Sequence, residues 1–513
     1  MRATRFSTIG MTRQCCIINL PKQESFIGKR TERLLSTGIV LLIMLSITGF
    51  LWTASSILLF PFSVDYGEGP LGDQSLRILA GQPIYKADIA SPPYVIANYP
   101  PLFPLLQAGV SAASGLPVLL SGRLISLLAS LICAMMLAWL GKSITKSWIA
   151  GVAAAGFFLG HPHVTIWSAL ARVDLLALAL SVAALLVVYR HWRSWRWIGV
   201  AIGLLLASIY TRQSYLLAGP LAASVWLWQQ DRRRSIVLAG SVGLGSASLF
   251  ILLNTLTQGG FYANIILANV NPVEFARLGT MFRQQFLIWP IFFLMISGSI
   301  LYTLAQYKRQ ATPDDIWMRY GLLPYTIGAL LASLTVSKVG SDVNYFLELI
   351  AAGAVWLAVL IHKLQSGKPA MRIILYSAII CQLIWLVAGG YVLNQTYVQS
   401  RWENIEQYEQ LAAQMRNATA QGQVLSDDYL GMIVQAGQQV YYAPFEYGQL
   451  YQAGHWNPAE LAAQIQARAF PLIVIGGDTL DKPCCWPPEL VQAIREQYTL
   501  EYYPRWIVCT PRR

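Results

Sequence analysis

The sequence predicts an all-α polytopic membrane domain followed by a small α/β domain. Of the 513 residues, 55% are hydrophobic and only 12% are charged, whereas soluble domains carry about 25% charged residues. The mean hydropathy is +0.47, and long apolar runs without charges recur between residues 37 and 393. Such runs are typical of membrane-spanning helices. The composition excludes a soluble globular protein, a disordered chain and a small disulfide scaffold.

The chain begins with a basic tail, residues 1–36, that we expect in the cytoplasm. The apolar run after the tail is too long for a signal-peptide core and has no small-residue cleavage site behind it, so it is predicted to be a first span. About eleven spans are expected within a membrane domain at 37–393: residues 37–60, 118–140, 147–166, 171–189, 197–210, 214–230, 235–256, 283–305, 319–336, 343–362 and 371–393.

The distribution of Lys and Arg predicts the orientation. Cytoplasmic loops collect these residues. With the tail inside, the inner loops hold Lys142, Lys146, Arg190, Arg193, Arg196, Arg232, Arg233, Arg234, Lys308, Arg309, Arg319, Lys363, Lys368 and Arg372. We therefore expect a multi-pass protein of the plasma (inner) membrane, and the net charge of +12 needs no nucleic-acid partner.

Two segments need separate interpretation. Residues 100–117, in the outer loop 61–117, are apolar but contain three prolines, and a span there would invert every later loop; we expect a half-inserted or interfacial helix. The arm at 197–210 is about 21 Å long as a helix, shorter than the roughly 30 Å hydrocarbon core. The polar turn Thr211–Ser214 should therefore lie below the outer surface.

The last segment, residues 394–513, is predicted to be a small extracytoplasmic α/β domain, because an odd number of spans places it outside. Short apolar runs alternate with helical stretches near 458–468 and 488–497. The runs are Gln423–Leu425, Val440–Tyr442, Pro471–Ile475 and Trp506–Val508. A disulfide from Cys509 to Cys484 or Cys485 is an open alternative in an oxidising compartment.

Polar residues collect at the outer ends of the predicted spans rather than at mid-membrane. Transporters bring such groups to the midplane on broken helices of two related halves, and neither feature is visible here. The outer cluster predicts an active site at the bilayer surface. It contains Asp65, Glu68, His161, His163, Arg172, Asp174, Arg212, Gln213, Lys338, Asn344 and Glu348.

Each of these residues also has a structural interpretation. Asp65 and Glu68 could be ordinary loop acids, although glycines around them allow close backbone approach. Arg172 and Asp174 could simply pair at a helix start. Arg212 and Lys338 are cations near the apolar zone, where charges are costly and kept for a partner.

The order of several motifs resembles the GT-C glycosyltransferases, in particular the family 39-like group with the protein O-mannosyltransferases and the aminoarabinose transferase of lipid A. An acid-bearing first outer loop is followed by Gly81-Gln-Pro-Ile-Tyr85, then Tyr99-Pro100-Pro101-Leu102, then Gly122-Arg123. The Arg172-Val-Asp174 helix start, the Thr211-Arg212-Gln213 turn and the stretch Asn344–Glu348 also resemble bacterial members. The resemblance covers about residues 37–400.

The resemblance implies inverting transfer of a sugar from a polyprenyl-phosphate donor to a hydroxyl of a glycan, lipid or protein on the outer membrane face. An acid of the first outer loop acts as base in that family, which maps to Asp65, with Glu68 second. Arg212, Lys338 and Arg172 are the candidates for binding the donor phosphate.

The remaining residues of the cluster, with Tyr99, would line the site: His161, His163, Asp174, Gln213, Asn344 and Glu348. Glu68 or His163 could hold a divalent metal, Mg²⁺ or Mn²⁺. The rivals are a transporter or flippase of lipid-linked sugars and a non-catalytic envelope protein.

Overall fold

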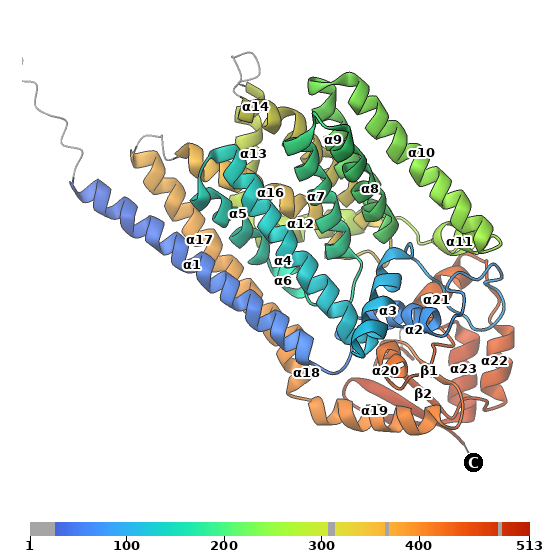
Figure 1. Cartoon of the computed structure of the whole chain (residues 1–513). Coiled ribbons are helices and arrows are strands. Elements are labelled where there is room, and N and C mark those ends of the chain that lie inside the picture. Colours follow the sequence, from blue (N-terminus) through green and yellow to red (C-terminus); the bar gives the residue numbers. More distant parts are fainter. Residues whose placement is uncertain (1–25, 306–312, 365–368, 481–484, 513) are drawn as a thin grey trace, which may run out of the picture.

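The computed structural model contains a bundle of long helices with a smaller mixed domain at one end (Figure 1). It describes residues 26–305, 313–364, 369–480 and 485–512. Two long helices of the bundle, α1 (Phe26–Leu59) and α17 (Pro369–Asn394), lie side by side along one flank. The other bundle helices are α4 (Val118–Thr145), α5 (Trp148–Leu159), α7 (Asp174–His191), α8 (Trp195–Thr211), α9 (Ala218–Gln230), α10 (Arg232–Leu256), α15 (Leu323–Ser333) and α16 (Leu347–Leu364).

The helices agree with the predicted spans in position but not all in length. Within the described residues, seven helices are long and apolar enough to cross a membrane, or eight if a bent pair counts as one span. That pair is α12 (Phe275–Ile288) and α13 (Pro290–Ala305), which meet at 95°. The predicted spans at 147–166 and 197–210 become the short apolar helices α5 and α8. A break at Gly160 and His161 separates α5 from α6 (Pro162–Trp167).

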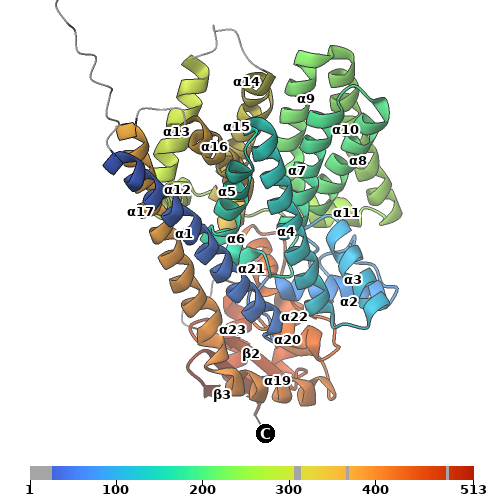
Figure 2. The same ribbon diagram turned by 60° about the vertical axis from the view of Figure 1, so that its left-hand side comes forward.

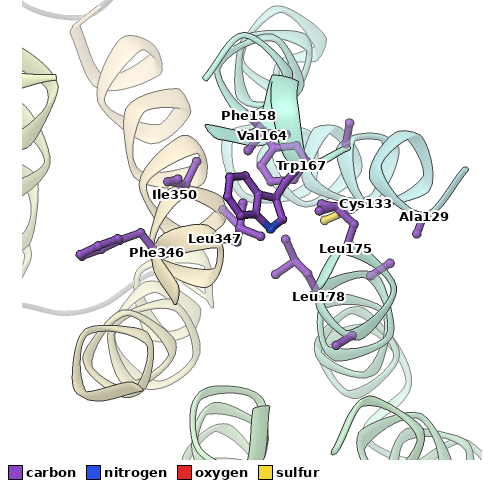
Figure 3. Packing of buried hydrophobic residues seen from close by; sticks show 14 of the residues in the cluster. Ala129, Cys133, Phe158, Val164, Trp167, Leu175, Leu178, Phe346, Leu347 and Ile350 are labelled. Carbon is purple, nitrogen blue, oxygen red and sulfur yellow. The ribbon is translucent and has the colours of Figure 1, made fainter. Parts of the chain in front are cut away.

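The bundle core is built around large apolar side chains. Trp167 lies between α16, which presents Leu347 and Ile350, and the α4 and α7 side chains Cys133 and Leu178 (Figure 3). All five side chains are buried. Burying a large aromatic side chain removes 150–250 Å² from solvent, so this contact fixes α16 against α4 and α7 just beneath the outer end of the bundle.

The first outer loop contains α2 (Glu68–Leu79) and α3 (Leu102–Ser114), and the latter is the short helix expected at 100–117. The Ser75 hydroxyl donates to Gln107 Oε1 over 3.0 Å, and Gln107 Nε2 donates to the Val118 carbonyl over 2.9 Å. Buried polar groups must be hydrogen-bonded, and these bonds tie both loop helices to the start of α4.

The C-terminal domain is a four-stranded sheet with helices, in the strand order β1-β2-β4-β3. Strands β1 (Val424–Ser426) and β2 (Leu472–Gly476) are parallel, whereas β4 (Trp506–Pro511) is antiparallel to both β2 and β3 (Tyr498–Tyr502). The helices are α19 (Ile405–Thr419), α20 (Leu430–Gln435), α21 (Pro444–Gln452), α22 (Ala459–Gln466) and α23 (Pro488–Gln497). The prediction of a small α/β domain is confirmed.

One sequence-based expectation for this domain is wrong. The apolar run Val440–Tyr442 is not a strand of the sheet; its backbone pairs with the outer loop at Tyr94 instead. The structure also decides the alternative left open for Cys509, which is a buried free thiol of β4, whereas Cys485 is disulfide-bonded. The sequence does not show whether an apolar run joins the sheet of its own domain or pairs with another part of the chain. It likewise does not show whether a cysteine is free or bonded.

The C-terminal domain is docked closely on the first outer loop (Figure 2). Asp73 Oδ1 accepts from the Val440 amide over 2.7 Å, and Arg77 donates to the Val440 carbonyl over 2.8 Å. The Tyr94 amide donates to the Tyr441 carbonyl over 2.7 Å, and Tyr447 Oη donates to the Ile89 carbonyl over 2.7 Å. Charged groups, backbone and side chains all join the two segments, so we treat them as one structural unit.

The orientation gives a first testable prediction. The basic loops before α8 and α10 lie at the end of the bundle opposite the C-terminal domain (Figure 1), and Arg190, Arg193 and Arg234 each stack on a tryptophan, as expected at a cytoplasmic membrane interface. We expect a membrane-impermeant maleimide added to intact cells to label an Ala453→Cys variant above the wild-type background and not an Arg193→Cys variant. Both positions are exposed. Equal labelling of both would contradict the topology.

Candidate active site

Asp65 lies in the turn directly after α1, at the outer end of the bundle. Its Oδ1 accepts from the Gly67 amide over 3.0 Å and pairs with Arg172 Nη1 over 2.8 Å. Both contacts use Oδ1, and Oδ2 makes no hydrogen bond to the described residues. The side chain is 27% exposed and faces a cavity. Asp65 is therefore held in place with one carboxylate oxygen free.

Glu68 occupies a different environment from Asp65. It is buried and accepts from both Nε and Nη2 of Arg123, over 2.9 and 3.0 Å, and from the amides of Ala171 and Val64, over 2.8 Å each. Burial raises the pKa of Glu68, but Arg123 and the two amides outweigh this and leave it below the ordinary value. All its acceptor capacity is used by the protein, so Glu68 differs from the sequence-based expectation of a catalytic or metal-binding acid.

Arg123 explains why Glu68 is so tightly held. Its guanidinium also donates to the carbonyls of Ile57, Phe60 and Phe62, over 2.6, 2.5 and 2.6 Å. These carbonyls belong to the last turn of α1 and the residues after it, which have no intrahelical partner. The buried pair thus shapes the chain segment that carries Asp65.

Arg172 lies between two carboxylates. Besides Asp65, its Nε is 3.7 Å from Asp174 Oδ2, and its Nη2 donates to Tyr99 Oη over 3.3 Å. Asp174 in turn pairs with Arg212 and accepts from Asn344 Nδ2 over 2.9 Å. The result is a row of alternating charges, Asp65–Arg172–Asp174–Arg212, that leads from the cavity wall into the bundle and fixes the guanidinium of Arg172.

Several predicted site residues lie inside the bundle rather than on a cavity wall. Arg212 is 2% exposed and stacks on the Tyr345 ring at 4.3 Å, in the sunken turn that the sequence predicts. Asp174, Asn344 and Glu348 are likewise buried. None of these four lines either cavity described below. Arg212 therefore contacts Asp174, which also lies beside Arg172, and the expected role of Arg212 at the donor phosphate stays a prediction.

One cavity, of about 520 Å³, opens beside Asp65 and is lined by carboxylates; we call it the acidic cavity. Asp342, which precedes α16, and Asp428, which follows β1, share its wall with Asp65. Arg401 is the cation on the wall. Its further lining is Ser63, Val64, Tyr66, His163, Ile166, Trp167, Leu170, Gln284, Val343, Leu393, Tyr397, Tyr408 and Tyr429.

Burial and nearby acids raise the pKa of two carboxyl groups on the wall of the acidic cavity. Burial raises the pKa of Asp342 above its ordinary value, and the charge of Asp65 adds to this although Arg172 opposes it. Burial and the nearby Asp427 and Asp478 raise the pKa of Asp428 to about 6. Like charges around one space disfavour ionisation, so this cavity is suited to a group that donates hydrogen bonds or a proton.

A second cavity, of about 150 Å³, lies on the other side of Tyr66 and contains Arg172 and Lys338; we call it the cationic cavity. Lys338 is half-buried, and its Nζ donates to Asn269 Oδ1 over 3.0 Å. Amide side chains form a further part of the polar lining: Gln74, Asn98, Gln213, Asn269 and Asn271. Tyr99 and Gln213, both expected to line the site, lie here. Two cations and several amides match a phosphate and the hydroxyls of a sugar.

The two histidines do not form a metal site with the nearby acids. His161 is buried and caps α6, accepting from the His163 amide over 3.2 Å, while His163 borders the acidic cavity and bonds Gln285 over 2.9 Å. In the part of the chain that the structure describes, no three His, Cys, Asp or Glu side chains lie close enough to hold a metal ion. The described residues therefore do not fit the divalent metal that Glu68 and His163 suggested.

Sequence reasoning missed residues that long-range folding brings to the site. Asp428 and Glu446 come from the C-terminal domain, whose contribution no local pattern indicates. The sequence places Asp342 in the outer polar cluster but gives it no role. The Gly122-Arg123 motif gains a physical reason from the burial of Arg123 beside Glu68.

Gly67 gives a second prediction, because its missing side chain makes room for Arg172. A Cβ there would lie 1.5 Å from Arg172 Nη1. Gly67→Ala should displace the guanidinium from Asp65 and lower the turnover of any reaction at this site by about 10²-fold, since a shift of about 1 Å in a positioned group can cost that much. Gly109→Ala in α3 is the matched control, because nothing lies within 4 Å of its Cβ position. Equal turnover of the two variants would contradict this.

Comparisons with known proteins agree with this architecture. No family model matches the sequence, and comparison with curated proteins gives no match. Among solved structures, ArnT from Cupriavidus metallidurans bound to undecaprenyl phosphate is similar over 92% of this chain and 97% of its own, with a TM-score of 0.58 and 12% identity. The archaeal oligosaccharyltransferase AglB from Archaeoglobus fulgidus, in complex with an inhibitory peptide and a dolichol-phosphate, is similar over 95% of this chain and 75% of its own, with a TM-score of 0.53 and 12% identity. The chain has the polytopic GT-C fold that these two proteins share.

Proposed function

We propose that this protein is a membrane glycosyltransferase that moves a sugar from a polyprenyl-phosphate-linked donor to an acceptor hydroxyl on the extracytoplasmic face. The observation that carries the proposal is the ion pair between Asp65 and Arg172, with Asp65 on the acidic cavity and Arg172 on the cationic one. A base and a phosphate-binding cation thus meet where the two cavities adjoin. The shared fold with ArnT and AglB supports this reading.

The chemistry follows from the position of each group. The acceptor hydroxyl, in the acidic cavity, gives its proton to the free Oδ2 of Asp65 while its oxygen attacks the anomeric carbon. The bond from that carbon to the phosphate oxygen breaks, and the phosphate leaves with the electron pair on the polyprenyl lipid. Arg172 and Lys338 stabilise the charge on the leaving phosphate.

The stereochemistry of the transfer follows from the same arrangement. The proposed base and the proposed phosphate ligands belong to different cavities, so the attacking and leaving oxygens approach the sugar carbon from opposite sides. A single displacement of this kind inverts the anomeric configuration. A retaining enzyme would need a carboxylate that attacks the sugar from the face opposite the phosphate, and Asp65 would then form a bond to the sugar.

The loop after η2 (Ala263–Leu267) offers a route for the donor lipid. Ala268, Asn269 and Asn271 of this loop line the cationic cavity, while Ile266, Leu267, Val273 and Phe275 around them are exposed, Phe275 by 80%. Apolar side chains exposed at the outer end of a membrane bundle contact lipid. A polyprenyl chain could therefore stay in the membrane while its phosphate enters the cavity.

The donor class gives a third prediction. Purified protein should transfer sugar from an undecaprenyl-phosphate-linked sugar and leave nucleotide sugars unchanged, because the cations of the cationic cavity lie beside exposed apolar side chains that suit a polyprenyl chain. Release of undecaprenyl phosphate, measured by mass spectrometry with a mixture of acceptor lipids and glycans, checks this. Turnover of a nucleotide sugar by pure protein would overturn the donor assignment, and transbilayer movement of intact sugar lipid without cleavage would favour a flippase.

A further inference from the structure

One carboxylate in the cationic cavity has no place in the chemistry above. Glu446, at the start of α21, lies among Arg172, Lys338 and the amide side chains, although a carboxylate repels a phosphate. It is 6% exposed and comes from the C-terminal domain. A buried acid in a phosphate-binding cavity must face a part of the ligand other than the phosphate.

The surroundings hold Glu446 in a fixed orientation. Its Oε2 accepts from Tyr66 Oη over 2.8 Å, and its Oε1 accepts from Asn98 Nδ2 over 3.0 Å. The carboxylate also interacts with its own backbone amide, which leaves one of its four acceptor positions for a ligand. Tyr66 directly follows Asp65, so Glu446 is tied to the residue next to the proposed base.

The neighbouring residue Phe445 shows that the fold leaves space for the first turn of α21 beside the cationic cavity. A Cβ at Gly340 would lie 2.2 Å from the Phe445 ring, and Gly340 has a φ of +81°, a conformation that favours glycine. Gly340 belongs to the turn that carries Lys338. The first turn of α21 therefore packs between the outer loop and the Lys338 turn, and the C-terminal domain completes the cavity wall.

We infer that Glu446 determines donor specificity by accepting a hydrogen bond from a hydroxyl group of the donor sugar. This inference rests on the proposed function and adds the group that distinguishes a sugar-bearing lipid from bare polyprenyl phosphate. Arg172 and Lys338 bind what the two lipids share, the phosphate. Glu446 binds what only the donor has, so the product lipid is released after transfer while the intact donor is retained.

The test compares two lipids on the purified full-length protein in detergent. Affinity is measured for undecaprenyl phosphate and for a panel of undecaprenyl-phosphate-linked hexoses and pentoses. Glu446→Gln should lower the affinity for the preferred sugar lipid by about 10- to 100-fold, as expected for loss of a hydrogen bond to a charged group, and leave the affinity for undecaprenyl phosphate unchanged. Glu460→Gln is the matched control, because Glu460 also accepts from an outer-loop tyrosine, Tyr94, over 3.0 Å but lines neither cavity.

Each alternative result has a distinct meaning. An equal loss for both lipids, or no loss for either, would overturn the role of Glu446 and leave the glycosyltransferase proposal intact. A wild-type protein that binds undecaprenyl phosphate but prefers no sugar would do the same. Failure of the wild type to bind any of the lipids would overturn the proposed function itself.

A second variant keeps the inference testable if Glu446→Gln folds poorly. Tyr66→Phe retains the carboxylate and removes one of the two hydrogen bonds that orient it. It should reduce the preference for the sugar lipid over undecaprenyl phosphate. An unchanged preference in a folded Tyr66→Phe protein would refute sugar recognition by a Glu446 carboxylate that Tyr66 orients.

Discussion

Replacing Asp65 by Asn is expected to lower turnover by about 10² to 10⁴, the range typical of losing a general base. The amide keeps the shape of the side chain and an oxygen that can still accept from Gly67 and Arg172. It cannot take a proton from the acceptor hydroxyl. Donor binding should persist, because Arg172 and Lys338 remain. The single-turnover rate should therefore fall while the donor affinity stays close to the wild-type value.

The comparison for Asp65 needs two further variants. Asp88→Asn is the control, since Asp88 is an exposed acid of the same loop whose Oδ1 accepts from the Ala90 amide. Asp342→Asn tests the other carboxylate near Asp65 in the acidic cavity. Near-normal turnover in Asp65→Asn combined with loss in Asp342→Asn would move the base to Asp342.

Glu68→Gln should act on stability rather than on chemistry. The change leaves the Arg123 charge buried with a neutral partner, and breaking a buried ion pair costs about 3–5 kcal/mol. We expect a clearly lower thermal unfolding midpoint in detergent and low yield in the membrane. Glu489→Gln, at an exposed glutamate of α23, should leave both unchanged.

Glu68 as the catalytic base predicts the opposite pattern. The Glu68→Gln protein would then fold and melt like the wild type, bind the donor and fail to transfer the sugar. Measuring unfolding and turnover on the same preparation distinguishes the two roles.

Much of the membrane domain could be predicted from the sequence because the physics is local. A run of apolar residues specifies a span wherever it occurs, and basic loops specify its direction. The position of Asp65 directly after the first span is likewise local, which is why it could be singled out. The apolar run at 197–210 is too short to cross the membrane as a helix, and this length alone predicted that the turn containing Arg212 is buried.

The roles of individual charges could not be predicted, because they depend on partners far away in the chain. Asp65 and Glu68 are separated by two residues and look equivalent in sequence. One faces a cavity, whereas the other meets Arg123 and the Ala171 amide. Arg212 likewise looks available for a phosphate until Asp174 is placed against it. The role of an acid in a loop, or of a cation at a helix end, is determined by the residues that it contacts in the folded protein.

The contact between Tyr66 and Glu446 has a consequence for biosynthesis. The two residues are 380 positions apart in the chain, which corresponds to roughly 20–75 s of synthesis at 5–20 residues per second. In the proposed orientation, the turn with Asp65 reaches the outside of the membrane before the wall with Glu446 has been made. On the proposed function, the chain therefore cannot select a donor until its last segment has been exported and docked, and a chain truncated before residue 446 is expected to insert in the membrane but to be inactive.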